Sequence, residues 1–157
     1  MEKFPMTPGG FETLKKELNQ LKTVDRRAVI AAIASARELG DLSENAEYHA
    51  AREKQGFIEA RIADLEAKVS QAEVIDPLSF SGDIVRFGAT VTIADEETDE
   101  EKTYQIVGVD EADVAAGLLS FSAPLAKALI GKSTEASVVV KTPGGEKSYE
   151  IISVVYK

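Results

Sequence analysis

The fold of the first half is decided by residues 48–72, YHAAREKQGFIEARIADLEAKVSQA. Apolar or small side chains, with one glutamine, recur here at alternating steps of three and four: Tyr48, Ala51, Gln55, Ile58, Ile62, Leu65, Val69 and Ala72. This spacing keeps one face of an α-helix apolar and is typical of helices that pack in a coiled coil. The polar Gln55 in this seam is expected to fix the register of the packed helices.

The preceding residues are expected to form the partner helix. Thr7-Pro8 reads as a helix N-cap followed by proline at the first helical position. Apolar residues then follow at helical spacing, regularly at first and less regularly later: Phe11, Leu14, Leu18, Leu21, Val24, Ile30 and Ile33. Because few residues separate the two runs, we predict an antiparallel two-helix coiled-coil hairpin.

The second half has the short apolar runs of a sheet. The period changes around residues 75–79, so we expect residues 1–75 to form the hairpin, 76–79 a linker and 80–157 a second domain. Strand-like runs cover Ile84–Ile93, Lys102–Val109, Gly117–Ser122, Ala136–Thr142 and Ser148–Tyr156. Pro124–Ile130 reads as a short helix, and the acidic run 95–101 as a solvated loop. The fold class is therefore α + (α+β), with a mostly antiparallel sheet.

The composition excludes several kinds of site and partner for this protein. A chain of 157 residues with 44% hydrophobic content can bury a core, and the absence of cysteine excludes disulfides and thiolate metal sites. The net charge of −9 opposes broad contact with free nucleic acid, so any RNA or DNA contact is expected to be weak and indirect. With no signal-like or membrane-spanning run, we expect a cytoplasmic protein that binds no membrane. We expect a monomer, because the hairpin covers its own seam.

Carboxylates gather where the two helical runs meet, at Asp41 and Glu44, with Glu47 nearby. One interpretation is structural: Asp41 as N-cap with Glu44 three residues later is a capping box, and Ser43 is another candidate cap. The other is metal delivery, since Mg²⁺ prefers carboxylate oxygens beside waters and phosphate oxygens. Two carboxylates cannot enclose a metal alone, but they can complete a site whose other ligands belong to another molecule.

Residues 40–57, GDLSENAEYHAAREKQGF, closely resemble the tip signature of the Gre family of bacterial transcript-cleavage factors. The chain looks more like the GreA branch than the GreB branch. The resemblance extends in order over nearly the whole chain, through segments 28–33, 87–92, 106–108, 129–132 and 141–146.

The resemblance implies an FKBP-like second domain and an accessory role rather than an enzyme. In that family the coiled coil enters the secondary channel of RNA polymerase. By this analogy Asp41 and Glu44 share Mg²⁺ with the polymerase, which then cleaves the extruded 3′ end of backtracked RNA. No cofactor is expected on the protein alone.

Two arginines beside the tip receive a role from the same resemblance. Arg37 and Arg52 are expected to contact the extruded RNA, although arginines on helix flanks often form surface ion pairs instead. Asn45, Glu47 and Tyr48 are expected to support the tip, with Asn45 orienting the Asp41 carboxylate and Tyr48 packing in the seam.

In the family, the segment before the short helix docks on the polymerase. Here Ser122 and Pro124 are the expected docking residues. Relatives commonly have serine directly before that proline, and this chain has Ala123, which leaves Ser122 as a candidate cap.

Three alternatives remain open. One is an inhibitory relative that occupies the same channel without promoting cleavage. A second is a peptidyl-prolyl isomerase, suggested only by the FKBP-like fold; it needs an aromatic-lined pocket, whereas the second half of the chain has no tryptophan and few other aromatics. A third is a coiled-coil adaptor or holdase chaperone, which explains the hairpin but not its acidic turn.

Overall fold

The computed structural model describes residues 3–41 and 45–157, which divide into two compact units. Residues 11–72 form the first unit, and residues 73–157 form the second together with the N-terminal residues 3–10. The boundary between the two units thus lies between Ala72 and Glu73, a few residues before the expected linker. Residues 77–79 form a short 3₁₀-helix, η2 (Pro77–Ser79), in which Pro77 is buried.

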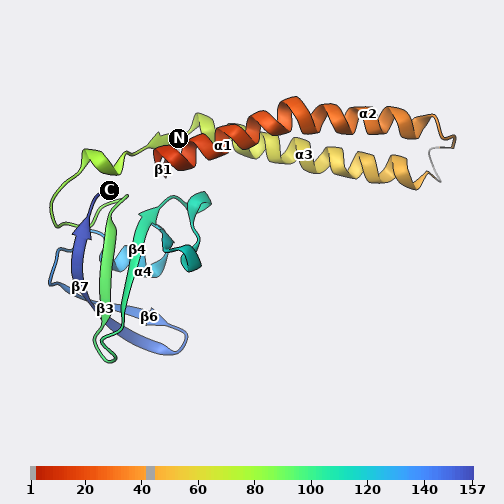
Figure 1. The fold of residues 1–157 in the computed structure, drawn as a ribbon. Helices are drawn as coiled ribbons and strands as arrows, with labels where there is room; N and C mark the ends of the chain where they lie inside the picture. Colours follow the sequence, from red (N-terminus) through yellow and green to blue (C-terminus); the bar gives the residue numbers. More distant parts are fainter. Residues whose placement is uncertain (1–2, 42–44) are drawn as a thin grey trace. The chain divides into compact units, whose positions relative to one another are not determined.

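The first unit is a helical hairpin. Its first arm runs through α1 (Pro8–Gln20), a π-helical turn η1 (Leu21–Asp25) and α2 (Arg26–Arg37), and α3 (Ala46–Ser70) is the second arm. α2 and α3 pack side by side (Figure 1). The expected seam of α3 is confirmed, because its most buried side chains are Ala51, Ile58, Ile62 and Leu65. With 25 residues, α3 is roughly 38 Å long.

The seam of the first arm differs from the expectation. Val24 and Ile30 are half exposed, at 50% and 51%, so their assignment to the seam is wrong. Val29, which was not expected in the seam, packs with Ile58 and Ile62, and Leu21 packs against the same cluster as expected. Leu21 and Val29 are eight positions apart, more than two ordinary helical turns, and the wide π-turn accommodates the additional residue.

Ion pairs cross the hairpin along its flanks. Arg26 binds Glu59 through two hydrogen bonds of 2.9 and 2.8 Å, and Arg61 binds Glu17 at 2.6 and 3.1 Å. The hydrogen bond between Arg26 and Glu59 raises the pKa of the guanidinium and lowers the pKa of the carboxyl group. These pairs are solvent-exposed and contribute little stability each, so the apolar seam holds the two arms together.

The second unit contains a mixed five-stranded sheet in the order β5-β4-β3-β7-β6. Its strands are β3 (Thr90–Asp95), β4 (Glu101–Val107), β5 (Leu118–Ser120), β6 (Ser137–Thr142) and β7 (Gly145–Val155). β3 pairs antiparallel with β4 and β7, and β6 pairs antiparallel with β7, whereas β4 and β5 are parallel. The short helix α4 (Pro124–Leu129) packs against β6. The expected strands therefore form, with one parallel pairing that the sequence pattern did not indicate.

One face of this sheet carries the core. Val91, Ile93, Ile106 and Ile151 are at most 1% exposed and cluster with Leu129 of α4. The expected strand 84–93 becomes regular only from Thr90. The acidic loop is solvated as expected, since residues 96–100 are exposed.

The N-terminal segment is fastened within the second unit. β1 (Phe4–Met6) pairs with β2 (Ala72–Val74), and Thr7 caps α1 as expected by accepting a hydrogen bond from the Gly10 N–H at 3.1 Å. The Glu111 carboxylate accepts hydrogen bonds from the Thr7 N–H, at 3.0 Å, and from the Thr7 hydroxyl. A Cβ at position 10 would lie 2.3 Å from the Glu111 side chain, which accounts for glycine there.

Among the described residues, no helix has the length and apolar character needed to cross a membrane.

Candidate functional site

The candidate site is the end of the hairpin where α2 gives way to α3. α2 closes with backbone hydrogen bonds from Glu38 to the Ser35 carbonyl, at 3.2 Å, and from Leu39 to the Ala36 carbonyl, at 3.1 Å. Gly40 then has a φ of +119°, a conformation that favours glycine because it has no Cβ. Asp41 follows this turn directly and is exposed.

Asn45 begins the second arm. Its Oδ1 accepts a hydrogen bond from the Tyr48 N–H at 3.0 Å, which makes Asn45 the N-cap of α3. The interpretation of Asp41 as that cap is therefore wrong, because α3 starts at Ala46 and Asn45 caps it. Leu42, Ser43 and Glu44 lie outside the described residues, so the placement of Glu44 stays a prediction.

Asp41 and Glu47 line the same shallow depression, which we call the tip hollow. Its volume is about 420 Å³, and Leu39, Asn45 and Ala46 complete the lining. Within residues 3–41 and 45–157, no group of three or more carboxylate or histidine side chains could hold a metal ion. The two described carboxylates of the tip hollow are too few to enclose an ion by themselves.

The two arginines near the tip come from different helices and meet at one surface, which we call the basic hollow. Arg37 of α2 and Arg52 of α3 line this depression of about 260 Å³, together with Ile30, Ile33, Ala34 and Gln55. Among the described residues neither arginine forms an ion pair, and the ion pairs of the hairpin join other side chains. The alternative of surface ion pairs for these arginines thus has no support in the described part of the chain.

Tyr48 contacts Arg52, one of the residues that line the basic hollow. Arg52 Nη1 donates a hydrogen bond to the Tyr48 hydroxyl at 3.2 Å, and the guanidinium lies 5.9 Å from the ring centroid. His49 contacts the same ring edge-on, with 5.6 Å between the centroids. Tyr48 is half-buried, as a packing role requires, and it also orients Arg52.

The expected docking segment forms a tight turn before α4. Pro124 and Ser122 are both exposed. The Ser122 hydroxyl pairs with Ser120 at 2.8 Å, and Ala123 is the N-cap residue without a side-chain bond. The expectation that Ser122 caps α4 is therefore wrong. The Ser122 hydroxyl pairs with the Ser120 hydroxyl, and no side chain of the described residues caps α4.

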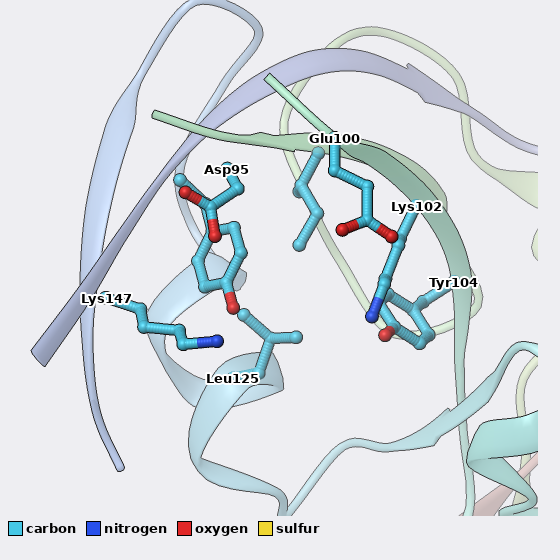
Figure 2. A pocket seen from close by; sticks show the side chains of 8 residues that line it. Asp95, Glu100, Lys102, Tyr104, Leu125 and Lys147 are labelled. Atoms are coloured by element: carbon cyan, nitrogen blue, oxygen red, sulfur yellow. The ribbon is translucent and has the colours of Figure 1, made fainter. Parts of the chain in front are cut away.

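A further hollow lies on the sheet face that α4 covers, and sequence reasoning missed it. Figure 2 shows side chains of β3, β4, β7 and α4 around it. The lining residues are Ile93, Asp95, Glu100, Lys102, Tyr104, Leu125, Lys147 and Tyr149. Its volume of about 70 Å³ is far below the roughly 300–1,000 Å³ of ordinary small-molecule sites. This hollow does not supply the aromatic pocket that the isomerase alternative needs.

The chain is similar to known proteins over its full length. Residues 4–74 match the family model described as "Transcription elongation factor, N-terminal", and residues 81–156 match "Transcription elongation factor, GreA/GreB, C-term". A protein of Cereibacter sphaeroides named "Transcription elongation factor GreA" is 68% identical, with 98% of each chain covered. A protein of the same name from Ruegeria pomeroyi is 64% identical, with 99% of each covered. A solved GreA/GreB structure from Nitrosomonas europaea is 24% identical, with a TM-score of 0.44 over 98% of this chain and 100% of that one.

Proposed function

Because this chain belongs to the GreA/GreB family of transcription elongation factors, we propose that it acts on RNA polymerase and stimulates cleavage of backtracked RNA. It is an accessory factor, and the nuclease activity belongs to the polymerase. The observation that supports this most directly is Asp41, an exposed carboxylate that follows the turn at the hairpin end and does not cap α3.

In this proposal the hairpin enters the secondary channel and brings its tip to the polymerase active site. Asp41 and Glu44 bind and orient an Mg²⁺ ion shared with the polymerase, and Asp41, exposed in the tip hollow, offers the hard oxygen atoms that this ion prefers. When bound, the ion supplies activation of the attacking water and stabilisation of the transition-state charge. Glu47, in the same hollow, adds to the negative field that attracts the cation.

The second unit, which we propose to be FKBP-like, docks on the polymerase through the turn that exposes Ser122 and Pro124. The protein acts as a monomer in the cytoplasm and meets DNA only weakly and indirectly, through the polymerase complex. The net charge of −9 is consistent with this, because it opposes independent binding of nucleic acid.

Arg37 and Arg52 hold the extruded RNA at the basic hollow in this proposal. We expect Arg37→Ala and Arg52→Ala each to lower the rate of stimulated cleavage roughly tenfold, since a hydrogen bond to a charged group contributes about 1.5–3 kcal/mol. The loss should be greatest at low salt, where phosphate contacts are strongest. Arg27→Ala is the matched control, because Arg27 is exposed on the same arm outside this hollow. Equal losses in all three variants would contradict a local RNA contact.

The decisive experiment is cleavage of a labelled transcript in a backtracked RNA polymerase complex, with and without this protein and Mg²⁺. We expect cleavage to accelerate only when both are present and elongation then to resume. Inhibition of the polymerase without cleavage would instead identify the inhibitory relative. Absence of any effect on the stalled complex would exclude both.

A further inference from the structure

We propose that Asn45 is a positioning residue: its amide fastens both helices at the hairpin tip and so holds the loop that carries Asp41. This role rests on the proposed function and goes beyond it. It also differs from a direct contact with the Asp41 carboxylate, because the amide acts on the backbone at both ends of the turn.

The two ends of the amide reach different helices. Oδ1 accepts a hydrogen bond from the Tyr48 N–H of α3 at 3.0 Å, while Nδ2 donates one to the Ala36 carbonyl of α2 at 2.5 Å. Ala36 itself is only 3% exposed, so this bond is anchored in the packed seam. One side chain thus bonds an N–H at the start of α3 and a carbonyl at the end of α2, which also accepts a hydrogen bond from the Leu39 N–H.

The orientation of the amide follows from its partners. Reversing it would place the NH₂ group against the Tyr48 N–H and the oxygen against the Ala36 carbonyl, and both contacts would be repulsive. Asparagine therefore fits this position better than the other residues that commonly cap helices. Serine and aspartate accept from an N–H equally well, but an ionised aspartate has no donor, and the serine hydroxyl is too short to reach the opposite helix.

The bond closes the base of the tip turn. Ala36 and Asn45 are nine positions apart, and Asp41 lies between them, beside Asn45 in the tip hollow. Fixing both ends of this turn restricts the backbone of Gly40 and Asp41, which lie within it. A carboxylate that must reach a metal ion in another molecule gains from this, because misplacement by about 1 Å can cost roughly 100-fold in rate.

The test is Asn45→Ser, which keeps an N-cap and loses the bond to Ala36. At saturating protein, we expect the cleavage rate to fall about tenfold or more, with the half-saturating protein concentration and the thermal midpoint nearly unchanged. Asn45→Ala loses the cap as well and should also lower the thermal midpoint. Asn19→Ser, on an exposed position of the same hairpin, is the matched control.

A second measurement needs no polymerase, so it separates this inference from the proposed function. In the free protein, the NMR order parameters of the Gly40 and Asp41 amides should fall in Asn45→Ser and stay unchanged in Asn19→Ser. Unchanged order parameters in Asn45→Ser would overturn the inference, as would full cleavage activity of that variant. A wild-type protein that fails to stimulate cleavage would instead overturn the proposed function, while the order parameters still decide the role of Asn45.

Discussion

Asp41→Ala is expected to abolish stimulated transcript cleavage while polymerase binding stays within about twofold. The same result is expected for Glu44→Ala. Removing a group that stabilises charge only in the transition state typically costs about 100- to 1,000-fold in rate, and binding is affected little because other surfaces dock the protein. The measurement is single-turnover cleavage of a stalled complex at saturating protein, with affinity determined separately by competition.

A matched control tests whether cleavage depends on a carboxylate at the tip or only on the negative charge of the hairpin. Glu53→Gln removes one negative charge from an exposed position of α3 outside the tip hollow, and it should leave cleavage unchanged. If Asp41→Ala weakened binding as much as cleavage, the tip would be a docking element rather than a donor of ligands. The metal-delivery proposal would then be wrong.

Ile62→Ala is expected to cost about 2–5 kcal/mol in the free energy of unfolding of the hairpin. Ile62 is 2% exposed and packs with Val29 and Ile58 in the seam, so its truncation leaves a cavity between the two arms. Because the arms carry the tip, cleavage should be lost at temperatures where the wild type is still active. Urea unfolding followed by far-ultraviolet circular dichroism measures the change.

Ile30→Ala is the matched control for this prediction. Ile30 follows the same apolar pattern in the sequence, yet it is 51% exposed, so its truncation should change the free energy of unfolding by no more than about 0.5 kcal/mol. Comparable losses in both variants would contradict the π-turn, since an unbroken α-helix would turn different residues toward α3.

The sequence predicted the second arm better than the first for a physical reason. Tyr48 to Ala72 keep alternating steps of three and four, and one straight helix then presents all of them on one face. In the first arm the spacing becomes irregular after Leu21, where η1 accommodates an additional residue. A π-turn depends on packing between the arms, so the pattern showed irregularity there without giving its cause.

The candidate site was predictable in part. The sequence predicted carboxylates at the turn between the helices and an arginine on each helix beside it. The structure brings these arginines, Arg37 and Arg52, to one surface. The sequence left the cap of α3 undecided among neighbouring polar residues, because each of them can accept a hydrogen bond from a helix N–H. Asn45 is distinguished by its second bond, to a carbonyl on the other helix.

Periodicity and turn residues act over a few neighbouring positions, so the two-helix hairpin, the strand-rich second half and the acidic turn could all be predicted from the order of the residues. The folded structure was needed to show which residues of the first arm face α3, that β4 and β5 run parallel, and that residues 3–10 join the second unit. Each of these depends on contacts between segments far apart in the chain. Such contacts are selected by the packing free energy of the whole fold, which no local pattern encodes.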